Sequence, residues 1–119
     1  MTSEGRFDIE YLRGIPIVQV AGEVDLTNVQ QLEAALDRAS RADQGTVVVA
    51  MGQTSYFDSK GVRTLLRAAE RLSVTRQQLV VVAPPGAIAR RILEIAGAAE
   101  TLPLFESLEE AMRPESGLG

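Results

Sequence analysis

The sequence contains no cysteine and no histidine, and these two absences exclude several common kinds of catalytic, metal-binding and cross-linked site. Without cysteine, the chain has neither a disulfide framework nor a thiolate nucleophile. Without histidine, it lacks the commonest general base, the commonest metal ligand and the usual partner of a catalytic serine. No glycine-rich phosphate loop is visible either. The composition therefore predicts a protein that is not an enzyme and that has no metal site and no cofactor.

Aromatic residues are also scarce, with no tryptophan, two tyrosines and three phenylalanines among 119 residues. A core must therefore be built from valine, leucine, isoleucine and alanine. The length predicts a single domain over 1–119, with an ordered core at about 6–113 and a flexible tail at 114–119. No apolar run approaches the ~18 residues of a membrane-spanning helix. The N-terminus lacks a signal-peptide pattern, so the expected location is the cytoplasm.

Acidic residues outnumber basic residues by 16 to 12, which gives a formal net charge of −4. This excess argues against nucleic acid or an anionic membrane as the main partner. Arginine supplies every basic side chain except Lys60, the only lysine. Nothing in the composition requires self-association, and a monomer is the simplest expectation.

Apolar patterns along the chain predict an opening hairpin followed by helices that alternate with strands. We expect strands at 7–12, 15–21, 46–51, 78–83 and 101–105. We expect helices that begin near Thr27, Ser59, Pro85 and Ser107. The run at 46–51 is continuously apolar or β-branched, which is typical of a strand buried on both faces. The order ββαβαβαβα predicts an α/β layered domain with a mixed, mostly parallel sheet packed by helices.

The segment around Ser59 is the most informative motif. A polar loop at 52–58 is expected to lead into a helix that Ser59 opens, which places its hydroxyl among unpaired backbone N–H groups. A phosphate there would be stabilised and would add a charge of about −1.5 to −2. Asp25 and Asp58 each follow a strand, so both can lie at the carboxyl edge of the sheet. Gly61 leaves the first helical turn without a side chain, which would let another chain approach.

Each of these residues also has a plainer interpretation. The pair of Asp58 and Ser59 can be only a helix cap, worth ~1 kcal/mol, and Asp25 only a turn residue. Lys60 can be a solvated cation or a charge partner for a phosphate on Ser59. The basic row on the same helix can be a solvated face or part of a docking surface, and it consists of Arg63, Arg67 and Arg71.

Two short segments stand out together: Gly22-Glu23-Val24-Asp25, and Phe57-Asp58-Ser59-Lys60-Gly61-Val62. In this order and element context they resemble the Gly-Glu-Leu-Asp and Asp-Ser-Ser/Thr-Gly-Leu segments of the STAS domain of bacterial anti-sigma factor antagonists. The likeness covers about 7–112 and implies the fold of that family.

The resemblance implies a phosphorylation switch at Ser59, which follows the loop aspartate. It implies that the unphosphorylated protein binds an anti-sigma factor with a GHKL-type ATPase fold and so frees a sigma factor. It further implies that this partner is a serine kinase whose phosphorylation of Ser59 ends the contact, and that a metal-dependent serine phosphatase resets the switch. The expected partner-binding residues are Asp25, Asp58, Ser59, Lys60, Gly61, Arg63 and Arg67.

Two positions differ from the family's pattern and keep an alternative open. Lys60 stands where a serine or threonine usually follows the phosphorylated serine, and Ala50 stands near an expected acidic or amide residue. The alternative is a constitutive STAS interaction or scaffold module without phosphorylation. A phosphoaspartate receiver built on Asp25 and Asp58 is disfavoured, because clustered acids after the first strand and a lysine after the last strand are missing.

Overall fold

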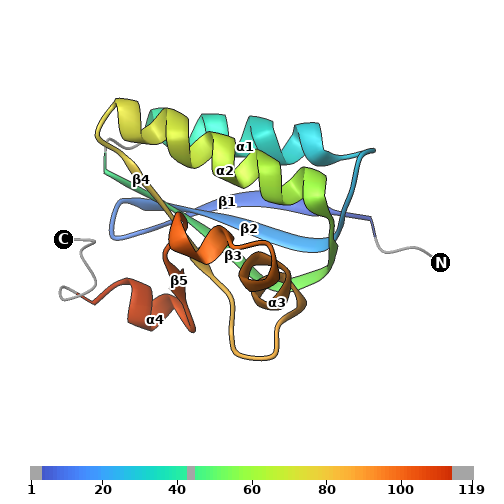
Figure 1. Ribbon diagram of the computed structural model, residues 1–119. Helices are drawn as coiled ribbons and strands as arrows, with labels where there is room; N and C mark the ends of the chain where they lie inside the picture. Colours follow the sequence, from blue (N-terminus) through green and yellow to red (C-terminus); the bar gives the residue numbers. More distant parts are fainter. Residues whose placement is uncertain (1–3, 43–44, 114–119) are drawn as a thin grey trace.

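The computed structural model describes residues 4–42 and 45–113 and shows a five-stranded sheet of order β1-β2-β3-β4-β5 (Figure 1). β1 pairs antiparallel with β2, and the other neighbouring strands pair in parallel. The strands are β1 (Arg6–Leu12), β2 (Ile15–Val24), β3 (Thr46–Phe57), β4 (Gln78–Val82) and β5 (Leu104–Phe105). The helices are α1 (Val29–Ala42), α2 (Ser59–Val74), α3 (Ile88–Ile95), the 3₁₀ turn η1 (Ala98–Glu100) and α4 (Leu108–Ala111). The predicted element order and mixed, mostly parallel sheet are confirmed.

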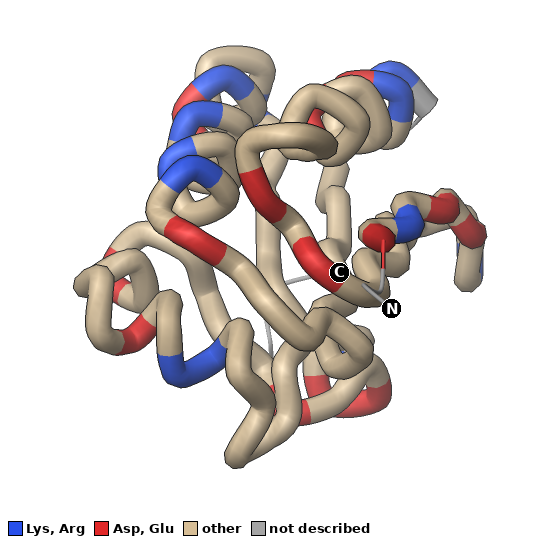
Figure 2. The backbone as a smooth tube through the Cα atoms, turned by 90° about the vertical axis from the view of Figure 1, so that its right-hand side faces the viewer, with Lys and Arg blue, Asp and Glu red and all other residues tan. Residues whose placement is uncertain are grey.

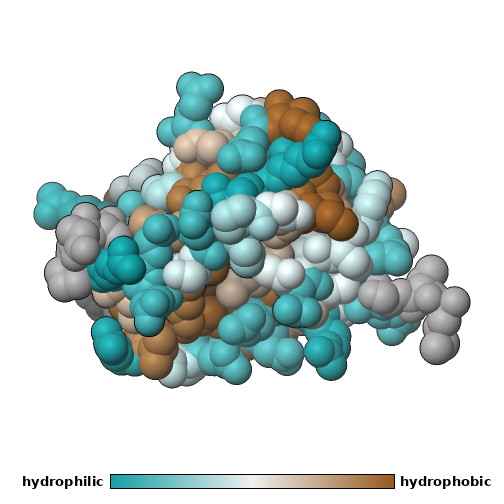
Figure 3. All heavy atoms as spheres, turned by 90° about the horizontal axis from the view of Figure 1, so that it is seen from below, coloured by the Kyte–Doolittle hydropathy of each residue, from teal (hydrophilic) through white to brown (hydrophobic). Residues whose placement is uncertain are grey.

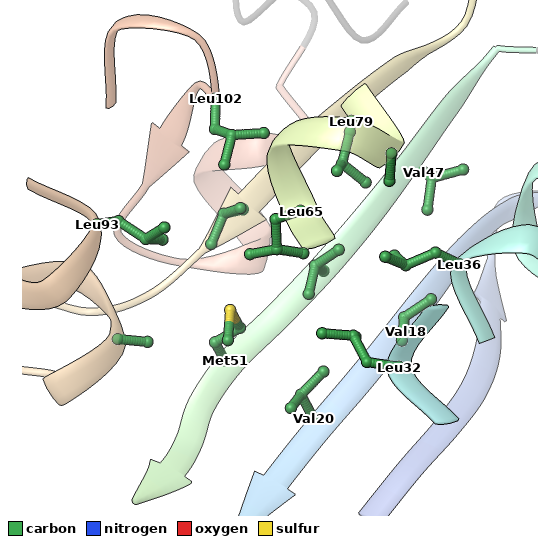
Figure 4. Close-up of a cluster of buried hydrophobic side chains, with 14 of the residues drawn as sticks. Val18, Val20, Leu32, Leu36, Val47, Met51, Leu65, Leu79, Leu93 and Leu102 are labelled. Atoms are coloured by element: carbon green, nitrogen blue, oxygen red, sulfur yellow. The ribbon is translucent and has the colours of Figure 1, made fainter. Parts of the chain in front are cut away.

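The larger core lies on the face of the sheet that α1 and α2 cover (Figure 1), and α3 contributes buried residues to the same cluster. Alternate residues of the central strands point into it, and the helices contribute buried leucines and alanines (Figure 4). Val18 of β2, Leu36 of α1 and Leu93 of α3 belong to this cluster. Among the buried residues described, Phe57 is the only aromatic one, as the composition led us to expect of an aliphatic core.

The opposite face of the sheet carries a smaller core. Ile17, Val48 and Val80 point to this side, where Ala111 of α4 packs against them. Nearer to β1 this face is polar, and Gln19 donates a hydrogen bond to Glu10 across the two strands at 3.1 Å. The central strand β3 is nonetheless covered on both faces over its first half, as its β-branched run predicted.

β3 extends further than predicted, because it replaces most of the loop expected at 52–58. β2 also continues beyond Ala21, and after two register shifts the strands pair again until Val24 lies opposite Phe57. The buried Thr54 hydroxyl donates to the Val20 carbonyl at 3.0 Å, which ties this polar half of β3 to β2. The loop prediction was wrong because the hydrogen-bond partner of this segment lies far away in sequence.

Two helix starts also differ from the prediction. α1 begins at Val29, and Thr27 donates to the Asp25 carboxylate instead of acting as the N-cap. α3 begins at Ile88 after a turn that includes both prolines, so Pro85 lies outside the helix. The expected Ser107 cap of α4 is confirmed by the hydrogen bond that its hydroxyl accepts from the Glu110 N–H at 3.0 Å. The predicted tail at 114–119 lies outside the described residues.

Candidate functional site

β2 and β3 end side by side at one edge of the sheet. Because Val24 and Phe57 are paired in parallel register, the next residues, Asp25 and Asp58, begin two adjacent turns. The two aspartates therefore share the carboxyl edge of the sheet, as expected. This edge is where an open α/β sheet most often places its functional residues.

Asp25 organises the turn between β2 and α1. Its Oδ1 accepts hydrogen bonds from the hydroxyl of Thr27 at 2.6 Å and from the Thr27 backbone N–H at 2.9 Å. Its own N–H donates to Asn28 Oδ1 at 3.0 Å. Donation by the Thr27 hydroxyl, and then by the Thr27 N–H, holds the pKa of the Asp25 carboxyl below its usual value. Asp25 thus presents a stable negative charge beside the end of β3.

Asp58 is the N-cap of α2. Its Oδ1 accepts hydrogen bonds from the backbone N–H groups of Lys60 at 3.0 Å and Gly61 at 3.2 Å. Two of the N–H groups that we expected to be unpaired at this helix end are therefore already used. Since an N-cap of this kind is worth about 0.5–2 kcal/mol, Asp58 fixes where α2 begins.

Ser59 is the first residue of α2, and its side chain is exposed. Within the described part of the chain, its hydroxyl takes part in no hydrogen bond. Of the pair interpreted as a possible helix cap, only Asp58 caps α2, and Ser59 does not. The Ser59 hydroxyl is consequently held in solvent at the start of a helix without a structural task of its own.

Gly61 lies underneath the site, so it does not offer an open approach. The residue is buried, and a Cβ placed on it would lie 2.7 Å from Cδ1 of Phe57 and closer still to Cε1. The expectation that Gly61 leaves space for another chain is therefore wrong. The space is filled by the Phe57 ring, which packs directly against the first turn of α2.

The remaining predicted residues lie on the outer surface of α2. Lys60, Arg63 and Arg67 are exposed, and basic residues follow one another along the helix (Figure 2). The ion pairs found among residues 4–42 and 45–113 join Arg41 to Asp37 and Arg90 to Glu94, so neither involves α2. This helix therefore carries a local positive row on a protein of net negative charge.

A groove of about 360 Å³ lies between α2 and α3, and Ser59 forms part of its rim. It is otherwise mainly apolar, with the lining residues Ser59, Val62, Arg63, Leu66, Ile92, Ile95 and Ala96. Figure 3 shows the corresponding hydrophobic patch over α3.

The sequence analysis did not include Ile92 and Ile95 among the candidate site residues. The sequence did contain a signal for them. The short helix α3 carries two rows of apolar residues, and only one of these rows can face the sheet. A larger groove of about 480 Å³ lies at the other end of β2, between the hairpin turn and α4, away from both aspartates.

The family model of the STAS domain matches residues 6–111. The chain belongs to the STAS domain family. BtrV of Bordetella bronchiseptica, whose name assigns it to the anti-sigma factor antagonists, is 31% identical over 108 residues, covering 89% of this chain and 90% of its own. BtrV is named as a regulatory protein, which agrees with the expectation that the chain is not an enzyme.

Solved STAS structures have the same fold. The crystal structure of an anti-sigma factor antagonist from Mycobacterium paratuberculosis superimposes with a TM-score of 0.82 at 24% identity, covering 94% of this chain and 96% of that one. The anti-sigma factor antagonist SpoIIAA in its unphosphorylated form gives a TM-score of 0.71 at 21% identity, covering 96% and 99%. In the part of this STAS domain that the structure describes, no helix has the length and apolarity to cross a membrane.

Proposed function

We propose that this STAS domain is an anti-sigma factor antagonist whose binding is switched by phosphorylation of Ser59. The observation that carries the proposal is the placement of Ser59, which is exposed, has no hydrogen bond to another described residue, and lines an apolar groove. The names of the relatives support the same class of function. SpoIIAA, which shares the fold, has been solved in an unphosphorylated and a phosphorylated form.

In the proposed cycle, the unphosphorylated domain binds an anti-sigma factor of the GHKL-type kinase class and thereby releases a sigma factor. The neutral Ser59 hydroxyl lies in the contact surface beside exposed basic and apolar side chains. Phosphorylation adds a charge of about −1.5 to −2 at that point, where it meets the acidic, nucleotide-bearing site of the partner, and such like-charge juxtaposition costs several kcal/mol. A serine phosphatase then restores binding. The proposed setting is the cytoplasm, with the domain acting as a monomer.

The other predicted residues divide into two roles under this proposal. Asp58 shapes the start of α2 that presents Ser59, as its hydrogen bonds to Lys60 and Gly61 indicate, and Asp25 shapes the adjacent turn after β2. Lys60, Arg63 and Arg67 contribute charge to the contact surface, and Gly61 acts indirectly by allowing Phe57 to pack. This division places the direct contacts on α2 and the supporting contacts at the ends of β2 and β3.

The proposal is tested by incubating the protein with ATP and each purified GHKL-type anti-sigma factor of the source organism. We expect the mass gain of one phosphate, which Ser59→Ala abolishes. Ser55→Ala is the matched control, because Ser55 is an exposed serine near the end of β3 and its loss should leave phosphorylation unchanged. Phosphate on another residue, or none with any kinase that binds the domain, would contradict the switch.

One observation favours a second candidate function, a constitutive STAS interaction module. Lys60 replaces the hydroxyl residue that commonly follows the phosphorylated serine in the family, and it directly follows Ser59 in the chain. The same experiment separates the two functions. A constitutive module binds its partner with the same affinity before and after incubation with ATP.

A further inference from the structure

The basic residues of α2 do not all face the same neighbour. Arg63 lines the groove between α2 and α3 together with Ser59. Arg71, on the same helix, lines a different groove between α1 and α2, together with Asp37 and Ser40. Only Arg63 therefore combines an exposed guanidinium with a place on the wall of the groove that Ser59 borders.

The groove beside Arg63 has apolar walls that nothing in the described chain covers. Ile95, which lines the groove, is 76% exposed. Ile92 and Leu66 are half-buried on the two sides of the groove. An apolar surface beside an exposed arginine is complementary to a partner segment that carries apolar side chains next to a carboxylate.

Ser59 and Arg63 are also neighbours along the helix. They are four residues apart on α2, and this spacing places two side chains on the same helical face with their Cβ atoms about 5–6 Å apart. Arginine pairs strongly with phosphate because its guanidinium donates two parallel hydrogen bonds. A phosphate on Ser59 would consequently lie within reach of Arg63.

We propose that Arg63 is a single contact for which the partner and the Ser59 phosphate compete. In the bound state a partner carboxylate pairs with Arg63 while neighbouring apolar side chains enter the groove beside Ile92 and Ile95. In the phosphorylated state the phosphate takes Arg63 within the same chain. This inference rests on the proposed function. It adds a second reason why phosphorylation weakens binding: besides the repulsion that the phosphate introduces, the partner loses its attractive contact with Arg63.

The intramolecular half of the proposal needs no partner. Phosphoserine is placed at position 59 during translation, and the second pKa of the phosphate, ordinarily about 6, is followed by ³¹P NMR. Arg63 should lower this pKa, so Arg63→Ala should raise it, while Arg71→Ala should leave it unchanged. The other nearby charges, those of Lys60, Asp58 and Asp25, are the same in all three proteins. An equal pKa in the parent and Arg63→Ala would overturn the pairing.

The intermolecular half is measured against the GHKL-type anti-sigma factor identified by the phosphorylation assay. Arg63→Ala and Ile95→Ser should each weaken binding of the unphosphorylated domain by about tenfold or more. The matched controls are Arg71→Ala and Val74→Ser, since Val74 is 80% exposed at the far end of α2. Both controls should bind like the parent.

A comparison of phosphorylated and unphosphorylated domains completes the test. Phosphorylation should weaken binding by a smaller factor in Arg63→Ala than in the parent, because the shared contact is already gone. Equal factors in the two backgrounds would overturn the inference while leaving the proposed function intact. If the parent binds no anti-sigma factor, the proposed function fails, and the NMR titration still decides whether phosphate and Arg63 pair.

Discussion

Replacing Gly61 by alanine should destabilise the fold, although helix propensity alone predicts the opposite. Alanine within a helix is favoured over glycine by about 0.8–1.0 kcal/mol. The added methyl would, however, lie 2.7 Å from Cδ1 of Phe57, a distance that the two groups cannot keep. Phe57 is 1% exposed, so its ring has no solvent to move into. Overpacking of this kind costs about 1–3 kcal/mol.

The two effects together predict a net loss of about 0–2 kcal/mol in the free energy of unfolding of Gly61→Ala. Equilibrium denaturation in urea measures this difference. A double-mutant cycle with Phe57→Leu isolates its cause, because a smaller side chain relieves the contact. We expect the cost of Gly61→Ala to fall, or to become a gain, in the Phe57→Leu background.

A gain of ~1 kcal/mol for Gly61→Ala in the parent sequence would refute this reasoning, because propensity would then act unopposed. The result also bears on function. Phe57 immediately precedes the capping residue Asp58, so a displaced ring shifts the cap and with it Ser59. Gly61→Ala should therefore weaken partner binding without any loss of a direct contact.

Three further predictions concern the same edge of the sheet. Asp58→Ala should lower the free energy of unfolding by about 0.5–2 kcal/mol, measured in urea, while Asp58→Ser, which keeps a capping oxygen, should cost less. Ser59→Asp should weaken binding to the anti-sigma factor in a titration but leave the unfolding transition in place, because the Ser59 side chain makes no hydrogen bond within residues 4–42 and 45–113 and a negative charge suits a helix N-terminus. Asp25 has a lowered pKa in the folded state, so it stabilises the fold above its unfolded-state pKa, and this contribution is lost as the pH falls through the folded-state value. Unfolding measured between neutral and acidic pH should show a weaker acid dependence in Thr27→Val, and an unchanged profile would contradict this assignment.

The sequence was sufficient to predict the order and pairing type of the elements, since hydrophobic periodicity is a local property. The alternating residues of β1 and the β-branched run at 46–51 were both read correctly. The second half of β3 was missed because its Gly52, Gln53 and Thr54 lack an apolar pattern. These residues are a strand only because β2 supplies hydrogen bonds from 30 or so positions earlier in the chain.

The start of α2 at Ser59 was predictable from the sequence, but the structural roles of the residues around it were not. Aspartate and serine both cap helices well, so the sequence could not decide whether Asp58 or Ser59 caps α2. The backbone decides, because Asp58 is extended (φ −102°, ψ −175°) and Ser59 is already helical. The role of Gly61 depends on the position of the Phe57 ring. That position follows from the extension of β3, which no local pattern indicated.

The division of roles between Asp58 and Ser59 explains how a modification here can act on the surface alone. If Ser59 capped α2, a phosphate would replace a hydroxyl that holds the helix start, and modification would disturb the fold. Because Asp58 caps through Lys60 and Gly61, the Ser59 hydroxyl can change its charge while the cap stays in place. The helix dipole favours the added negative charge by about 0.3–1 kcal/mol at an exposed site. Phosphorylation can then change the free energy of partner binding and not that of folding, and a binding loss of ~1.4 kcal/mol already lowers the affinity tenfold.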